Sequence, residues 1–387
     1  MKAKTDITTE NGFKETEIGL IPSDWDIKEF TECVDKESIP KDIKIPQGQF
    51  SKIGKYPIID QGSEFIAGYT DDKNKLYAGN LPIIVFGDHT RILKYIDFQF
   101  SVGADGTKLI QPKGFLHPKY FFYYLCSLSI PSKGYNRHYK YLKENFIAFP
   151  QQKSEQQKIA AVLSKIQQAI EQQEKIIQIT KELKKSLMNR LFTEGLHSEE
   201  QKETEIGLIP KSWSIKKLNE YAKVKYGKQK PKIIGSIPVV GSSGVYAGCK
   251  DALINFPTLI VGRKGTAGAV HLFLEPCWPS DTTFYLEWRY DEVNPKFLYY
   301  YMLTHLLSGE HAKTTMPSLQ RQDLEEYTFP FPSKKEQTEI TDIIDKVNIK
   351  ITQAETRKQA LQALFKTMLN QLMTGKIRVK NLDIEVN

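Results

Sequence analysis

The sequence predicts a tandem duplicate of α/β (α+β) domains, each followed by a long helix. The first observation is that KETEIGLIPSDW at residues 14–25 recurs as KETEIGLIPKSW at residues 202–213. The second is that further pairs of similar segments follow in the same order along the 387 residues. The third is that each copy ends in a segment with the apolar spacing of a helix. An internal repeat of this length indicates two domains of one design.

The globular part of each copy is expected to combine short strands with an aromatic helix. LPIIVFG at 81–87 and FPTLIVG at 256–262 are apolar runs bounded by glycine and proline, which is typical of buried strands. HPKYFFYYL at 117–125 and NPKFLYYYM at 294–302 predict helices with proline in the first turn.

Residues 155–191 and 336–372 predict long amphipathic helices, each about 55 Å in length. The apolar positions are Ile159, Val162, Ile166, Ile170, Ile177, Leu183, Leu187 and Leu191 in the first helix, and Ile340, Ile343 and Val347 in the second. Ser154 with Gln157, and Ser333 with Glu336, are candidate capping boxes, and Gly195 is a candidate stop. A helix with one apolar stripe cannot bury it alone. We therefore expect the two helices to pair as an antiparallel coiled coil with pseudo-twofold symmetry.

These features predict five segments. They are a first globular domain at 14–150, a first long spacer helix at 151–196, a second globular domain at 202–332, a second long spacer helix at 333–375, and a C-terminal tail at 376–387. In the repeated segment at the start of each domain, we expect Trp25 and Trp213, with the nearby prolines, to pack the domain onto the helices.

Composition excludes several classes of protein. The apolar runs are far shorter than the roughly 20 residues that cross a bilayer, and the first thirty residues lack a signal-peptide core, so we expect a cytoplasmic protein without membrane contact. Cys33, Cys126, Cys249 and Cys277 form no CxxC pair, which predicts small buried side chains rather than disulfides or a zinc site. We expect no metal.

The distribution of charge says more than the net charge of +8. Residues 108–143 contain seven Lys or Arg and no acid, and residues 221–250 contain six Lys and no acid. Such runs are usually solvated faces. Aromatic and amide residues interleave with the cations in YNRHYKY (135–141) and KYGKQKPK (225–232), which favours a nucleic acid partner.

Two motifs suggest enzymatic chemistry that the repeat argues against. NPKF at 294–297 is one residue away from the NPPF signature of amino-methyltransferases, but its copy is HPKY at 117–120, so both are interpreted as helix starts. VGRKGTAG at 261–268 lacks the spacing of a phosphate-binding P-loop, and its counterpart FGDHTRIL keeps one glycine. Backbone turning is the preferred reason for these glycines.

The repeated EIGLIPxxW, the VGRKGTAGAV stretch at 261–270, the NPKFLYYYM helix, the EQxxI opening of a long helix and its MLNQLxTG ending resemble the specificity subunit of type I restriction-modification systems, from Lys14 to Lys376. The resemblance implies two target-recognition domains, each of which reads one half of a bipartite sequence in double-stranded DNA. It implies that the helices act as spacer and docking site for two methyltransferase (modification) subunits, with restriction or translocase subunits as further partners. It also implies a non-catalytic chain without a cofactor, since S-adenosylmethionine and ATP would bind only to the partner subunits.

Polar residues where the two copies differ are the candidates for DNA contact, because two half-sites need different side chains on one scaffold. In the first copy they are Gln61, Ser63, His89, Arg91, Arg137, His138, Lys140 and Lys143. In the second copy they are Ser242, Ser243, Arg263, Lys264, Thr266, Thr315, Gln320 and Arg321. Arg and Lys can hydrogen-bond guanine, and Gln can hydrogen-bond adenine.

Two alternatives stay open. One is a stand-alone adenine-N6 DNA methyltransferase, although no glycine fingerprint follows a strand and opens a helix. The other is a coiled-coil adaptor without a DNA role, which would leave the two acid-free runs unexplained.

Overall fold

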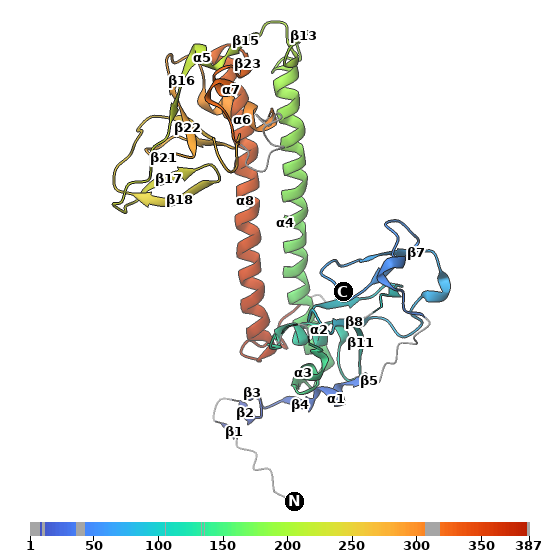
Figure 1. The fold of residues 1–387 in the computed structure, drawn as a ribbon. Coiled ribbons are helices and arrows are strands. Elements are labelled where there is room, and N and C mark those ends of the chain that lie inside the picture. The colour runs from blue at the N-terminus through green and yellow to red at the C-terminus, as the bar shows by residue number, and fades with distance from the viewer. Residues whose placement is uncertain are drawn as a thin grey trace, which may run out of the picture. The chain divides into compact units, whose positions relative to one another are not determined.

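The chain forms two compact units, each containing one globular domain and one half of each long helix (Figure 1). The computed structural model describes residues 8–9, 12–35, 43–104, 106–132, 134, 136–305 and 318–384. The first unit comprises residues 1–173 and 357–387, and the second comprises residues 174–356. The long helices are α4 (Lys153–Glu194) and α8 (Lys334–Met373).

The globular part of the first unit is built mainly on two sheets. The larger sheet is antiparallel, in the order β5 (Val34–Asp35), β11 (Thr107–Pro112), β8 (Ile83–Gly87) and β9 (Leu93–Ile96). The smaller sheet has the order β10 (Ser101–Val102), β6 (Tyr56–Ile59) and β7 (Gly68–Thr70), with β10 parallel to β6. At the periphery lie β12 (Phe146–Pro150) with β4 (Trp25–Glu29), and β1 (Thr8–Thr9), β2 (Phe13–Thr16) and β3 (Gly19–Pro22).

The second unit repeats this topology, except that β1 has no counterpart among the described residues. Its larger sheet has the order β16 (Ala222–Tyr226), β22 (Thr283–Trp288), β19 (Thr258–Gly262) and β20 (Val270–Phe273). Its smaller sheet has the order β18 (Gly244–Cys249), β17 (Ile237–Gly241) and β21 (Trp278–Pro279), with β21 parallel to β17. The peripheral pairs are β15 (Ser214–Lys217) with β23 (Thr328–Phe331), and β13 (Gln201–Thr204) with β14 (Gly207–Pro210). The predicted duplication of α and β domains is therefore confirmed.

Three short α-helices occupy equivalent places in each unit, and the first unit has two 3-10 helices in addition. The first unit has α1 (Phe30–Cys33), α2 (Pro118–Ser127), α3 (Tyr139–Lys143) and the 3-10 helices η2 (Gln47–Gln49) and η3 (Lys73–Lys75). The second has α5 (Leu218–Tyr221), α6 (Pro295–Thr304) and α7 (Arg321–Glu325). Both aromatic helices begin as predicted, with Pro118 and Pro295 in the first turn.

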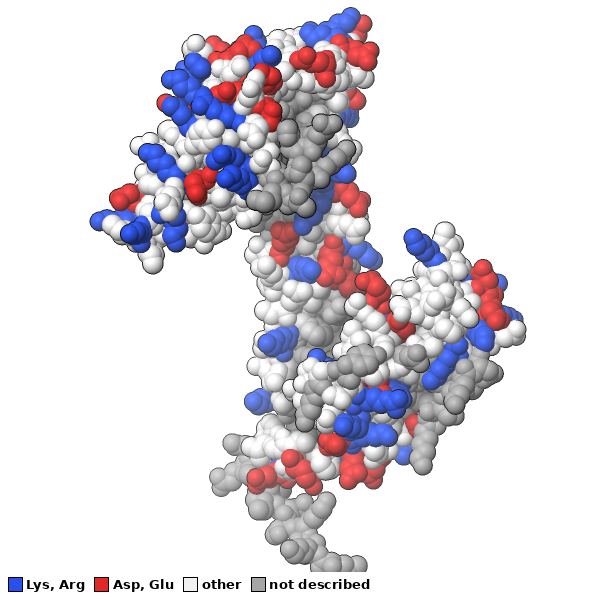
Figure 2. Space-filling view, in the orientation of Figure 1, with Lys and Arg blue, Asp and Glu red and all other residues white. Residues whose placement is uncertain are grey.

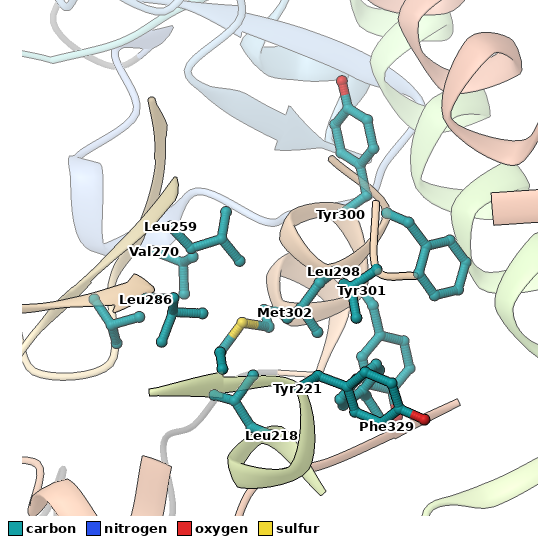
Figure 3. Packing of buried hydrophobic residues seen from close by; sticks show 14 of the residues in the cluster. Leu218, Tyr221, Leu259, Val270, Leu286, Leu298, Tyr300, Tyr301, Met302 and Phe329 are labelled. Atoms are coloured by element: carbon teal, nitrogen blue, oxygen red, sulfur yellow. The ribbon is translucent and has the colours of Figure 1, made fainter. Parts of the chain in front are cut away.

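One core in each unit joins the larger sheet, the aromatic helix and the long helices. In the first unit, Phe86 of β8, Phe121 of α2, Ile159 of α4 and Leu372 of α8 are fully buried in one cluster. In the second unit, Figure 3 shows Leu259 and Leu286 of the sheet facing Leu298 and Met302 of α6. Because residues of both long helices belong to these cores, each domain is anchored to the helix halves of its own unit.

The repeated segment forms a corner that closes on the end of a long helix. Trp213 is buried, and its Nε1 donates to Glu336 Oε2 of α8 at 3.0 Å. Gly195, just after α4, has φ +65°, and a Cβ there would lie 3.1 Å from Pro210 Cγ. In the first unit, Gly375 follows α8 with φ +66°, and a Cβ there would lie 2.2 Å from Pro22 Cγ and 3.4 Å from Trp25. The expected packing of both tryptophans onto the helices is thus observed, with Gly195 as the predicted stop.

The long helices run antiparallel within the second unit. Lys181 Nζ lies 2.6 Å from Glu355 Oε1, and ten residues further along α4, Leu191 shares the core with Ile340 near the start of α8. Pairing along the full length of the helices, and a pseudo-twofold axis, stay predictions.

For the long helices, the predicted cap at the start of α8 is found, whereas two predictions for α4 are wrong. Ser333 is the cap of α8, since its Oγ accepts from Glu336 N at 3.2 Å. Ser154 lies inside α4, which begins at Lys153, so the capping box predicted from Ser154 is wrong. Leu183 is 57 % exposed and does not belong to the buried stripe, whereas Met188 and Phe192 are buried. The stripe thus shifts toward the core of the second domain near the end of α4.

The cysteines follow the expectation with one exception. Cys33, Cys249 and Cys277 are buried, but Cys126 on α2 is exposed. Its helix turns this position away from the core residues Tyr124 and Leu125. Among the described residues, no helix is long and apolar enough to cross a membrane.

The predicted C-terminal tail packs back onto the first unit. Arg378 donates to both carboxylate oxygens of Asp24, at 2.8 and 2.7 Å, and to both of Glu155, at 2.8 and 3.0 Å. Lys380 Nζ lies 3.2 Å from Asp24, and Val379 is buried. The hydrogen bond from Arg378 is the main reason that the pKa of Asp24 falls from 3.8 to about 2. The tail therefore fastens the end of α8 to both the repeated segment and the start of α4.

Replacing Asp24 with Asn should destabilise the first unit in a pH-dependent manner. Because the folded state lowers the pKa of Asp24, the stabilisation is present above pH about 4 and is lost as the pH falls toward about 2. We expect a loss of about 0.5–1 kcal/mol in the free energy of unfolding at pH 7, since the pair is largely exposed, and a smaller loss at pH 3. Urea unfolding at both pH values measures it, with Asp383→Asn as the control. Equal losses at pH 7 and pH 3 would contradict the assignment.

Candidate nucleic-acid interface

Several of the residues predicted to contact DNA lie, in each unit, around the end of one central strand. In the first unit this strand is β8, and in the second it is β19. The turn after β19 contains Gly265 with φ +79° and Gly268 with φ +81°, angles that favour glycine. The glycines of VGRKGTAG therefore turn the backbone, as predicted. The turn after β8 is shorter and uses Arg91 at φ 64°.

A polar cleft of about 340 Å³ opens at the end of β8. It is lined by Lys44, Asp88, His89, Gly106, Thr107, Lys108 and Arg137. These residues come from four separate parts of the chain, which are the segment before β6, the turn after β8, the start of β11 and the segment before α3. The cleft thus joins the predicted His89 and Arg137 to two lysines that were not among the candidates.

Asp88 fixes the geometry of this cleft from within. Its side chain is almost fully buried, and Oδ1 accepts from the backbone N–H of Tyr139 at 2.8 Å. Its carbonyl accepts from the backbone N–H of His138 at 2.8 Å, and its Oδ2 lies 3.9 Å from Lys108 Nζ. Asp88 therefore ties the segment that carries Arg137 to the end of β8.

Gln61 lies beside the cleft, after the last residues of β6. Its Oε1 accepts from His89 N at 3.1 Å, and its carbonyl accepts from Thr90 Oγ1 at 2.6 Å. A Cβ at Gly106, which has φ +70°, would lie only 2.4 Å from Gln61 Oε1. The absence of a side chain at Gly106 therefore leaves room for the Gln61 amide at the rim.

The loop that carries Gln61 and Ser63 is anchored by a buried lysine of β9. Lys94 is 4 % exposed, and its Nζ donates to the carbonyl of Glu64 at 2.5 Å and lies 3.6 Å from Asp60 Oδ1. Burial lowers the pKa of Lys94, and the neighbouring Asp60 opposes that change. Ser63 itself is exposed on this loop.

The second unit has the same arrangement with different side chains. Ser242 follows β17 as Gln61 follows β6, and its carbonyl lies 3.0 Å from Nε2 of His271 on β20. His271 occupies the strand position of Lys94, because both residues face the third residue of the neighbouring strand, Ile260 and Val85. The two units therefore anchor equivalent loops with a histidine in one case and a lysine in the other.

Arg263 takes the place of Asp88 at the end of the central strand. Its guanidinium carbon lies 5.0 Å from the ring centroid of Tyr226, which is 47 % exposed. Its carbonyl accepts from Leu319 N at 2.9 Å, as that of Asp88 accepts from His138 N at 2.8 Å. The buried carboxylate of Asp88 in one unit is thus replaced by the stacked guanidinium of Arg263 in the other. The charge at the end of the central strand therefore differs between the units.

The other candidates of the first unit do not line this cleft. His138 is 1 % exposed, and its Nδ1 lies 2.9 Å from the Asp88 carbonyl, so the structure gives it a place in the interior. Arg91 Nη1 donates to the Ile130 carbonyl at 3.0 Å and lines a different pocket. Lys140 and Lys143 are exposed, with their Nζ atoms 4.8 and 5.1 Å from tyrosine ring centroids of α3.

The remaining candidates of the second unit lie either near the end of the central strand or on α7, and one lies outside the described residues. Lys264, Thr266 and Ser243 are exposed around the turn after β19 and the end of β17. Gln320 caps α7, and Arg321 pairs with Glu325 at 2.7 Å along the same helix. Thr315 lies outside the described residues. A contact with DNA stays a prediction for every candidate.

Neither the cleft residue Lys44 nor the two side chains that anchor the neighbouring loops were identified from the sequence. Lys44 carries no local signal, because its segment reaches the cleft only through the bridge between Ile45 and Gly103. Lys94 and His271 occupy equivalent strand positions, so an alignment of the two copies extended across this hairpin pairs them as a polar substitution in an apolar strand.

The arrangement suits binding of an anion and hydrogen bonding to exposed edges. Lys44, Lys108 and Arg137 supply three cations around one cleft. In the face shown in Figure 2, groups of Lys and Arg lie on both domains with Asp and Glu close by, so neither domain is uniformly basic there. Within the described ranges, no group of three His, Cys, Asp or Glu residues could hold a metal ion.

Comparison with known proteins identifies the family. A model of the type I restriction modification DNA specificity domain matches residues 22–181 and again residues 210–363. The putative type I restriction enzyme MjaX specificity subunit of Methanocaldococcus jannaschii is 25 % identical, over 96 % of this chain and 98 % of that protein. The MjaVIII specificity subunit of the same organism is 26 % identical over 59 % of this chain and 61 % of its own length.

Solved structures show the same fold. The crystal structure of a type I restriction-modification S subunit from M. genitalium aligns with a TM-score of 0.63 at 19 % identity, covering 90 % of this chain and 96 % of that one. A chain from a structure describing complex assembly and conformational transition of a type I system aligns with a TM-score of 0.52 at 13 % identity, covering 92 % and 99 %. Because the family model matches both copies and most of the sequence, the chain belongs to the type I restriction-modification DNA specificity family.

Proposed function

We propose that this chain is the sequence-specific DNA-binding subunit of a type I restriction-modification complex, in which each unit reads one half of a bipartite target. The observation that carries the proposal is the pair of equivalent sites with different polar side chains. Gln61 and Asp88 in the first unit correspond to Ser242 and Arg263 in the second. A shared scaffold with changed donors and acceptors is what two different half-sites require.

In the first unit, the cleft cations would hold phosphates while the rim would meet base edges. Lys44, Lys108 and Arg137 surround the cleft, and phosphate contacts set the position of a protein on DNA without reading its sequence. The Gln61 amide, whose Oε1 accepts from His89 N, is a rim group with both a donor and an acceptor.

In the second unit, Arg263 is the leading candidate for a base contact. Its guanidinium is stacked near the exposed ring of Tyr226, which limits its side-chain freedom before binding. A guanidinium held in this way suits bidentate hydrogen bonds to guanine.

The long helices would dock two methyltransferase subunits, with restriction or translocase subunits as further partners. In support, Ile176, Ile179 and Leu183 are 48 %, 64 % and 57 % exposed at helical spacing on the half of α4 in the second unit. Exposed apolar stripes of this kind mark protein interfaces. Adenine methylation and DNA cleavage, with S-adenosylmethionine and ATP, would then belong to those partners.

A non-catalytic role is supported by the surroundings of Asn294, the residue of the methyltransferase-like motif. Its Oδ1 accepts from Lys296 N at 3.0 Å as the cap of α6. Its backbone N–H donates to Gln337 Oε1 at 2.7 Å, and its Nδ2 lies 3.5 Å from Thr338 and Thr341. These hydrogen bonds give the Asn294 carboxamide a structural role as the cap of α6.

Changing Lys44, Lys108 and Arg137 together to Ala should weaken binding of the full chain to a random-sequence duplex. Each lost phosphate contact should reduce the log–log salt slope by about 0.9, so the slope should fall by up to about 2.7. Gel shifts over a series of salt concentrations measure the slope.

The matched control is Lys14, Lys28 and Lys366 changed to Ala, which removes the same charge from the first unit outside the cleft. The control should change the slope much less. Equal slopes in the two triple variants would show that only net charge matters and that the cleft is no binding site.

The purified chain should transfer no methyl group from labelled S-adenosylmethionine to DNA, whereas the chain with its methyltransferase subunits should methylate adenine at a bipartite sequence. Asn294→Ser keeps a good helix cap but removes the carboxamide, so methylation by the assembled complex should be unchanged. Methylation by the isolated chain that disappears in this variant would establish the enzyme alternative instead.

A further inference from the structure

The two units carry an equivalent lysine and tyrosine on the aromatic helix, but they face different residues on the long helix. Gln156 of α4 accepts from His117 N at 2.7 Å, and Gln337 of α8 accepts from Asn294 N at 2.7 Å, which fixes the equivalence of the helices. By this register Lys119 corresponds to Lys296, Tyr123 to Tyr300, and Ser164 of α4 to Asp345 of α8. The duplication thus provides an internal comparison at one site.

In the second unit, a carboxylate completes the site. Lys296 Nζ lies 2.5 Å from Asp345 Oδ2, and the hydroxyl of Tyr300 donates to Asp345 Oδ1. Asn348 Nδ2 donates to the Tyr300 oxygen at 2.8 Å. One carboxylate therefore receives both an ammonium and a phenol donor.

In the first unit, the same two donors face a serine and an open pocket. Tyr123 Oη lies 3.1 Å from Ser164 Oγ. Within the part of the chain that the structure describes, Lys119 has no carboxylate within 4.0 Å, and its Nζ lies 3.9 Å from the Tyr95 ring centroid. A pocket of about 280 Å³ beside it is lined in part by Ala160, Ala161 and Ser164, where α8 has Thr341, Asp342 and Asp345.

The charges around this pocket favour an anion. Two cations, Lys119 and Lys165, line it together with one acid, Asp97, and with His117, whose pKa is lowered by burial and by neighbouring lysines. Burial is the main reason that the pKa of the half-buried Lys119 is lowered, and Asp97 and Glu171 oppose the change only from a distance. A bound carboxylate would compensate the Lys119 ammonium in the way that Asp345 does for Lys296.

We propose that the pocket between α2 and α4, at Lys119, Tyr123 and Ser164, binds a carboxylate group. The group would receive hydrogen bonds from Lys119 and Tyr123, as the Asp345 carboxylate does from their counterparts. It can come from a free carboxylic acid or from an Asp or Glu side chain of a subunit that docks on α4. The site does not depend on DNA recognition, so its test is separate from that of the proposed function.

The first arm of the test uses acetate and the isolated full chain. Acetate at about 100 mM should raise the melting temperature by about 2–4 °C above the value in chloride of equal ionic strength. Ser164→Asp installs the missing carboxylate and should abolish the acetate effect, as should Lys119→Met, which keeps the aliphatic stem. Asp345→Ser opens the same site in the second unit, so its stability should be partly restored by acetate and not by chloride.

The second arm uses the methyltransferase subunits. If the carboxylate belongs to a docked subunit, Ser164→Asp should weaken assembly about tenfold or more by repelling it, while Ser164→Ala should change assembly little. An acetate effect without an assembly effect would assign the site to a free carboxylate, and an assembly effect would assign it to a side chain. No acetate effect in the wild-type chain together with equal assembly of the two Ser164 variants would overturn the proposal.

Discussion

Each domain depends on one packing contact, in which a proline and a tryptophan of the repeated segment pack against the glycine that follows a long helix. Trp25 and Trp213 are buried at these contacts, and Gly375 and Gly195 hold the positive φ that lets the backbone leave the helix. At Gly375 a methyl group would lie 2.2 Å from the Pro22 ring. Such contacts leave little room for substitution of the proline, the tryptophan or the glycine, which fits their repetition in both copies.

The sequence predicted the parts of the fold that rest on local pattern. The strands β8 and β19, the proline-started helices α2 and α6 and the long helices all follow from apolar spacing and caps. It could not predict where an amphipathic stripe rotates from one neighbour to another, so Leu183 was wrongly included. Nor could it show that residues after Gly375 pack back on the first domain, because that contact joins the two ends of the chain.

The sequence predicted several surface residues of the candidate site but not the buried residues that hold them in place. The candidates Gln61, His89 and Arg137 do converge, because differences between the copies cluster where the scaffold ends and the surface begins. His138 shares the same sequence context but is buried against Asp88, and only tertiary packing separates it from Arg137. The anchors Lys94 and His271 are polar side chains in apolar strands, and their partners lie about thirty residues away. Because the domain is duplicated, equivalent positions of the two units can be compared directly. Where the backbone is the same and the side chains differ, the functional groups at the surface have changed.

We propose that two copies of one scaffold read two halves of one DNA target independently. This independence is tested most directly by replacing residues 26–150 with the corresponding region of another type I specificity subunit and mapping adenine methylation in cells that contain the methyltransferase partner. One half of the methylated sequence should change while the other half stays the same. A change in both halves, or in neither, would contradict it.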